Sequence, residues 1–217
     1  MNFYTQLVEH TQADKQAFMQ RDIITDTLAG NISLQRYQAF LTQAYHHVKH
    51  TVPLLMACGS RLTPELSWLQ AAIAEYIEEE LGHEHWILND LESTGISRDD
   101  IAQQPPAFAT EQMIAYAYHQ IDRGNPLAFF GMVYVLESTS TALATHTAGL
   151  VQQQLSLPDE AFSYLRSHGA LDLEHMEFFA SLMNKITDAG QQAVVIHAVK
   201  SFYRLYGEVL SHAGEYA

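Results

Sequence analysis

A short segment in the last third of the chain carries three side chains that can bind a metal or move protons. In SHGALDLEHMEFF, residues 167–179, His168, Asp172 and His175 stand at positions i, i+4 and i+7. In an α-helix these positions fall within a sector of about 60°, so the three side chains would share one stripe. The same stripe carries the apolar Leu165 and Phe179, which indicates that it faces the interior. Because a buried charge is unfavourable unless it is paired or metal-bound, the segment predicts either a metal or catalytic site or a buried polar network.

A second candidate follows a long apolar run. Residues 127–136, LAFFGMVYVL, are apolar on every side of a helix, which is typical of a helix buried all round. Glu137 ends this run, and a carboxylate in such a place is unfavourable unless it has a partner. Glu137 therefore either lines a functional crevice or hydrogen-bonds a tyrosine.

A third candidate lies in EYIEEELGHEHWILNDLESTG, residues 75–95. Glu79 and His83 form an i, i+4 pair on a partly apolar stripe, which could face inward. Glu80 and His85 remain alternatives for these two positions. The acidic run 78–80 also fits a solvated helix face.

These segments together offer carboxylates and imidazoles from three separate helices. Such a donor set, with no thiolate, suits iron or manganese and is less distinctive of zinc. Helical bundles build dinuclear sites by projecting Glu and His side chains inward from facing helices. The predicted metal ligands are Glu79, His83, Glu137, His168, Asp172 and His175. Two irons per chain are expected, and manganese or a single metal remain alternatives.

The chain contains 12 histidines, and several of them lie outside these three segments. His46, His47 and His50 in YHHVKHT could support the metal ligands, contact a substrate or form a polar surface patch. His197 in VVIHAV is expected to be a hydrogen-bonded core histidine.

Composition limits the possible partners. The formal net charge is −14 with only 11 Lys and Arg residues, which argues against nucleic acid and against anionic membrane surfaces. Cys58 is the only cysteine, so neither a disulfide within the chain nor a thiolate metal site is expected, and a reducing, cytoplasmic setting is the simplest inference. The N-terminus lacks the pattern of a signal peptide, and no stretch approaches 18 uncharged apolar residues.

Helices account for almost the whole sequence, and no alternating pattern is long enough to predict a strand. Breaks at Gly30, Gly95 and the RGNP sequence at 123–126 separate long amphipathic segments. Seven segments are predicted, at about 3–28, 33–62, 63–93, 110–122, 125–155, 158–186 and 188–213. The predicted fold is a single all-α domain over residues 1–217.

At these residues the chain resembles the haem-oxygenase-like, TenA/PqqC-like superfamily, and within it the diiron oxidases called iron-containing redox enzymes. EELGHEHWILNDLESTG is similar to the third helix of these proteins, YVLEST to their central glutamate motif, and HGALDLEH to their H-x3-D-x2-H metal motif. The resemblance covers nearly the whole chain at the level of helix order. It implies a bundle of about seven helices around a central cavity, with the six residues above as ligands of two irons.

The resemblance implies a non-haem diiron oxidase or oxygenase that uses dioxygen to oxidise a small amine, amino acid or fatty acid. A homodimer would fit the superfamily. The alternatives are a TenA-like hydrolase, a mononuclear metal enzyme, or a non-catalytic metal- or small-ligand-binding protein. Thiamin hydrolysis is disfavoured because QDY of the TenA type reads QAY here, with Ala44, and Cys58 is the only thiol. A haem oxygenase would need a proximal histidine on the first helix, for which His10 is the candidate.

Overall fold

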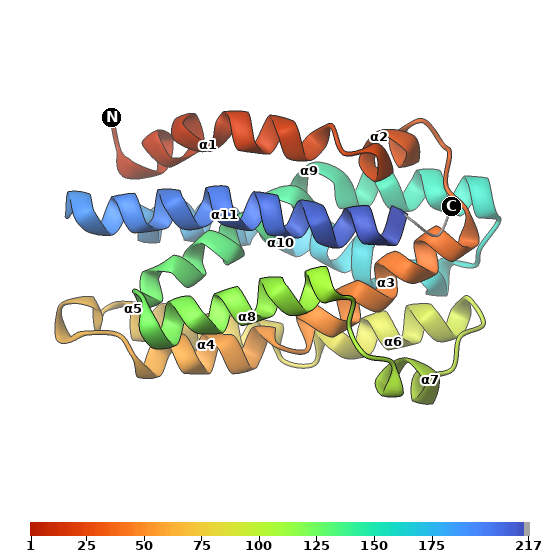
Figure 1. Cartoon of the computed structure of the whole chain (residues 1–217), viewed down its shortest axis with the longest axis horizontal. Coiled ribbons are helices and arrows are strands. Elements are labelled where there is room, and N and C mark those ends of the chain that lie inside the picture. The colour runs from red at the N-terminus through yellow and green to blue at the C-terminus, as the bar shows by residue number, and fades with distance from the viewer. Residues whose placement is uncertain (215–217) are drawn as a thin grey trace.

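The helices run largely along one long axis and form a bundle (Figure 1). The computed structural model describes the backbone of residues 1–214 and all of their side chains except those of 170–173 and 214. Within these residues there is no strand, so the predicted all-α class is confirmed. The α-helices are α1 (Phe3–Met19), α2 (Asp22–Leu28), α3 (Leu34–Val48), α4 (Thr51–Ser60), α5 (Leu69–Glu80), α6 (His83–Ser93), α7 (Arg98–Gln103), α8 (Phe108–Arg123), α9 (Phe129–Leu155), α10 (Ser163–Met183) and α11 (Ala189–Gly214). Three 3₁₀ turns, Pro64–Leu66, Pro126–Ala128 and Asp159–Phe162, precede α5, α9 and α10.

All seven predicted segments are helical, but the first three are each divided. The second breaks at Lys49 and His50. Pro53 lies in the first turn of α4, where its missing N–H costs no hydrogen bond. The third breaks at Leu81 and Gly82. Gly82 has φ +90°, a left-handed conformation that glycine adopts without a Cβ clash. The polar stretch after Gly95 contains the short helix α7.

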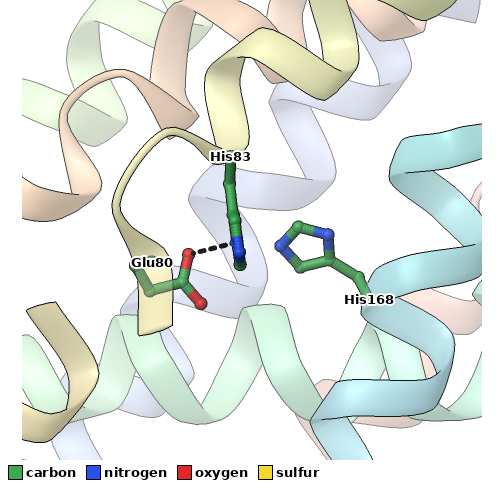
Figure 2. A group of neighbouring side chains, drawn as sticks. All are labelled: Glu80, His83 and His168. Carbon is green, nitrogen blue, oxygen red and sulfur yellow. Dashed lines mark hydrogen bonds and ion pairs between the residues drawn. The ribbon is translucent and has the colours of Figure 1, made fainter. Parts of the chain in front are cut away.

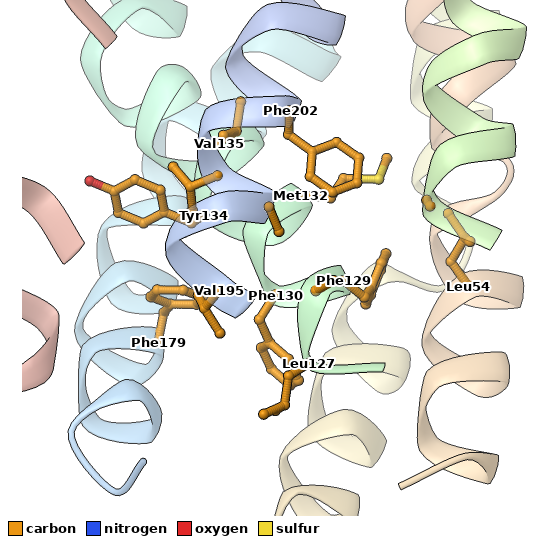
Figure 3. Close-up of a cluster of buried hydrophobic side chains, with 14 of the residues drawn as sticks. Leu54, Leu127, Phe129, Phe130, Met132, Tyr134, Val135, Phe179, Val195 and Phe202 are labelled. Atoms are coloured by element: carbon orange, nitrogen blue, oxygen red, sulfur yellow. The ribbon is translucent and has the colours of Figure 1, made fainter. Parts of the chain in front are cut away.

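The central helix α9 packs against α10 and α11 and supplies much of the core. Figure 3 shows Phe130 and Tyr134 of this helix beside Phe179 of α10, with Phe202 of α11 near Met132. Pro126–Leu155 is long and apolar enough to cross a membrane, and 67% of its apolar window is buried inside the bundle, as in the core helix of a globular domain.

Helix α11 corrects one prediction about a histidine. His197 is exposed, whereas its neighbours Val195, Ala198 and Val199 are buried. The apolar letters around His197 belong to the opposite face of the helix, so the expectation of a core histidine was wrong.

Two contacts fix the position of α10, which carries the HGALDLEH motif. Asp90 of α6 is fully buried, and its carboxylate accepts hydrogen bonds from the backbone N–H groups of Ser163 and Tyr164, both at 2.9 Å, and from the Ser163 hydroxyl. Further along, a Cβ on Gly169 would lie 2.4 Å from Thr145 Oγ1 and 3.2 Å from its backbone nitrogen, so the absence of a side chain lets α10 approach α9. These contacts set the first two turns of α10 against α6 and α9.

Candidate metal centre

Three candidate ligands from three helices converge beside the central cavity. Glu80 ends α5, His83 begins α6 and His168 lies on α10, and one donor atom of each lies within 4.8 Å of the others. Figure 2 shows His168 facing the Glu80–His83 pair across the site. His83 Nδ1 is 3.1 Å from Glu80 Oε2, and both side chains are largely buried. Two imidazoles and one carboxylate at this separation form a donor set that suits iron.

The break at Gly82 decides which glutamate joins His83. The prediction of an i, i+4 pair between Glu79 and His83 assumed a continuous helix. Because the chain turns at Gly82, the Glu80 side chain is the one beside His83 and is only 12% exposed. Glu79 is 43% exposed and its Oε2 lies 3.0 Å from His175 Nε2. His85, the other alternative, is 65% exposed and lies near Glu84.

A second group of predicted ligands lies around His175. This imidazole is buried, and its Nδ1 is 3.6 Å from Glu137 Oε1 while its Nε2 contacts Glu79. Glu137 is buried, as the end of the apolar run predicted. The edge of the Tyr76 ring also contacts the His175 ring, with centroids 5.9 Å apart. Asp172 belongs to the same predicted set, but its side chain lies outside the described residues.

Neighbouring groups orient two of the imidazoles. The indole of Trp86 stacks on the His83 ring with centroids 3.9 Å apart. His168 Nδ1 lies 3.2 Å from the carbonyl oxygen of Tyr164, which can only accept a hydrogen bond. A neutral His168 in this contact carries its proton on Nδ1, which leaves the Nε2 lone pair for a metal.

The charge balance of the cluster favours an ionised Glu80. Burial alone would raise the pKa of this carboxyl, but the hydrogen bond from His83 and the positive charges of His168, His83 and His175 together hold the pKa below its usual value. Burial and the charge of Glu137 raise the pKa of Tyr76, so this phenol stays neutral.

The cavity beside these residues is mostly apolar and has a volume of about 160 Å³. Side chains of α2, α3, α4, α5, α9, α10 and α11 line it, including Phe40, Leu55, Phe129 and Leu136. The candidate ligands Glu80, Glu137 and His168 form part of its wall, as do Tyr76 and His47. No Lys or Arg occurs among the described residues that line it. The site can therefore bind a small, largely apolar molecule next to the metal ligands.

The three histidines of YHHVKHT have different surroundings. His47 lines the cavity, whereas His46 contacts Lys49 Nζ at 3.3 Å and His50 contacts the Tyr118 hydroxyl at 3.2 Å. Of the alternatives left open by the sequence, contact with a bound molecule is therefore available to His47.

A comparison with protein-family models matches residues 38–207 to a family described as iron-containing redox enzyme. The chain belongs to the iron-containing redox enzyme family. The match covers helices α4 to α10 entirely and most of α3 and α11, so it contains all six predicted ligands and Glu80. No match was found among the curated proteins compared with the chain.

Solved structures similar to this family member share its fold. A domain of unknown function with a heme oxygenase-like fold from Shewanella denitrificans is 21% identical, with a TM-score of 0.87 over 99% of this chain and 93% of that one. A TenA homologue from Pseudomonas syringae is 14% identical, with a TM-score of 0.80 over 98% and 93%. A heme oxygenase from the cyanobacterium Synechocystis, in complex with heme, is 11% identical, with a TM-score of 0.76 over 100% and 94%. The expected fold is therefore confirmed.

Two residues considered for the other activities of this fold lie away from the cavity in this member of the family. His10, the candidate proximal haem ligand, is exposed on α1. Cys58 is buried in α4, where its Sγ lies 3.4 Å from the carbonyl oxygen of Pro126, and burial raises the pKa of its thiol to about 12. Neither residue lines the cavity.

Proposed function

We propose that the protein is a non-haem iron oxidase or oxygenase that oxidises a small organic substrate in the central cavity with dioxygen. The observation that carries this proposal is the convergence of Glu80, His83 and His168 at the cavity in a member of the iron-containing redox enzyme family. The donor set, two imidazoles and one carboxylate, is the one typical of non-haem Fe(II) oxygenases.

The proposed ligands form two groups. Glu80, His83 and His168 would hold one iron, and His175 and Glu137 a second, with Asp172 as a further predicted ligand of the pair. Iron bound there would supply the electrons and the coordination position needed to reduce dioxygen. Glu79 is proposed as a partner of His175 rather than as a ligand, because its side chain is the more exposed of the two glutamates.

The protein's own residues would prepare the site for this chemistry. The contact with the Tyr164 carbonyl and the stacking of Trp86 hold the rings of His168 and His83 in place, which avoids reorganisation when the metal binds. The carboxylates of Glu80 and Glu137 offset the charge of the metal. Apolar cavity walls such as Phe129 exclude water from the substrate.

An anaerobic Fe(II) titration of the metal-free protein tests this proposal. We expect two irons per chain, and we expect the iron-loaded protein to consume dioxygen. His168→Ala should reduce the iron count, whereas His146→Ala, on the exposed face of α9, should leave it unchanged. One iron per chain would favour the mononuclear alternative, and the absence of iron binding would refute the proposal.

A further inference from the structure

A buried histidine in the cavity wall has no role in the proposed metal centre. His47 lies on α3, is 1% exposed and lines the cavity. Its Nδ1 has no hydrogen-bond partner among the residues that the structure describes, and its ring contacts Tyr206 edge-on at 5.8 Å between centroids. Leaving a buried polar nitrogen unpaired is unfavourable. Such a group in a cavity wall indicates a site for a polar atom of a bound molecule.

The surroundings of His47 keep it uncharged. Burial, together with the charges of His168, His50 and His46, lowers the pKa of His47 to about 3. A neutral imidazole can donate from one nitrogen and accept at the other. Tyr76, Thr139 and Ser140 also line the cavity, and within the described part of the chain their buried hydroxyls have no hydrogen-bond partner. The cavity therefore offers several uncharged polar groups within a mainly apolar wall.

The charges of the cavity restrict what it can bind. Glu80 and Glu137 are its acidic residues, and no Lys or Arg among the described lining residues could pair with an anionic group. Its volume of about 160 Å³ is close to that of engineered apolar cavities that bind benzene, about 150 Å³. A ligand of this size would be a small, compact molecule rather than a large polar one.

We propose that the cavity binds a small, largely apolar molecule carrying one uncharged hydrogen-bonding group, such as a hydroxyl or carbonyl, and that His47 positions this group. That the bound molecule is the substrate rests on the proposed function; the binding itself needs no metal. His47 is a specificity-determining residue in this proposal, and the metal ligands are separate from it.

The neighbouring His46 provides a matched control. It also lies on α3, is fully buried and has an unpartnered Nε2. However, it is not among the residues that line the cavity. Replacing His46 by Leu removes a comparable buried imidazole without changing the cavity wall, so it separates an effect on folding from an effect on binding.

The experiment measures binding of four fluorinated probes to the metal-free protein by ¹⁹F NMR: 4-fluorobenzyl alcohol, 4-fluorotoluene, 4-fluorobenzoate and 4-fluorobenzylamine. The alcohol should bind the wild type most tightly. His47→Leu should weaken the alcohol roughly fivefold, the value of one net hydrogen bond, and leave 4-fluorotoluene within about twofold. His47→Asn, whose side-chain amide reaches the region of Nδ1, should restore most of the loss, and His46→Leu should change neither affinity.

Three outcomes would overturn the proposal. These are tighter binding of the benzoate or the amine than of the alcohol, an equal loss for 4-fluorotoluene in His47→Leu, or no binding of any probe to the wild type. Because the protein is free of metal in this assay, none of these results depends on whether it binds iron. Failure of the iron titration with retained selectivity for the alcohol would refute the proposed function alone.

Discussion

Replacing Glu80 and Glu79 separately by Gln tests the assignment of the first metal-binding glutamate. Glu80 is 12% exposed and lies beside His83, whereas Glu79 is 43% exposed and contacts His175. The substitution to Gln preserves size and removes the charge. Any difference between the two variants therefore reports the role of each carboxylate at the metal rather than a loss of packing.

The expected magnitudes differ widely. Groups that merely support a metal ligand are worth about 10–100-fold in affinity, so loss of a ligand such as Glu80 should weaken Fe(II) binding at the first site by at least about 100-fold. A partly exposed ion pair contributes up to about 1 kcal/mol, so Glu79→Gln should change the affinity by no more than about fivefold.

Anaerobic competition with a chromophoric Fe(II) chelator measures these affinities. Glu78→Gln, an exposed residue of the same acidic run, serves as the control and should bind iron as the wild type does. Thermal denaturation of the metal-free variants checks that each is folded. If Glu79→Gln abolished binding and Glu80→Gln did not, the geometric reasoning based on the break at Gly82 would be wrong.

Three further predictions concern the framework of the site. Gly169→Ala should destabilise the protein by about 1–3 kcal/mol in urea denaturation, because its Cβ would overlap Thr145, and Thr145→Ala in the same chain should recover part of the loss. Asp90→Ala should cost about 2–4 kcal/mol in the same assay. Asp90→Asn keeps one oxygen for the Ser163 groups but places an NH₂ group against the Tyr164 N–H, so it should cost less, about 1–2 kcal/mol; equal losses would contradict a capping role. The pKa of His47 is about 3 in the folded protein and 6.5 in a free histidine, so between these values the unfolded chain binds one more proton than the folded chain. The free energy of unfolding should therefore fall by up to about 1.4 kcal/mol for each pH unit below 6.5. His47→Leu, unfolded in urea at pH 7, 6 and 5 with chelator present, should lack this component, and an unchanged pH slope would exclude it.

The helical class and the buried position of Glu137 follow from features that are local in the sequence. An apolar run on every side of a helix requires a buried helix, and α9 is one. The breaks within the first three segments were harder to predict, because residues such as Lys49 and His50, between α3 and α4, are compatible with a helix and carry no local signal for its end.

His197 shows that apolar neighbours in the sequence do not predict burial unless the position of the residue around the helix is also known. Its flanking residues in VVIHAV are apolar, but in α11 the buried positions Val195, Ala198 and Val199 turn away from the face that His197 occupies. Hydrophobic neighbours in sequence therefore do not place a side chain in the core, and the position on the helical wheel decides.

The candidate ligands are brought together in two ways, and only one of them can be recognised from the spacing of residues in the sequence. On α10, His168 and His175 stand two turns apart in one continuous helix, so their common stripe follows from the 3.6-residue period alone. Between α5 and α6 the chain turns at Gly82, and Glu80 and His83 meet across that turn. Gly82 is the feature of the sequence that indicates a break here, because glycine readily adopts left-handed backbone conformations such as φ +90°, which often end a helix. The sequence does not specify how far the second helix rotates at this turn, so which glutamate lies beside His83 is a tertiary property. Asp90, on the same helix as His83, accepts hydrogen bonds from the first turn of α10 and so holds His168 opposite the Glu80–His83 pair.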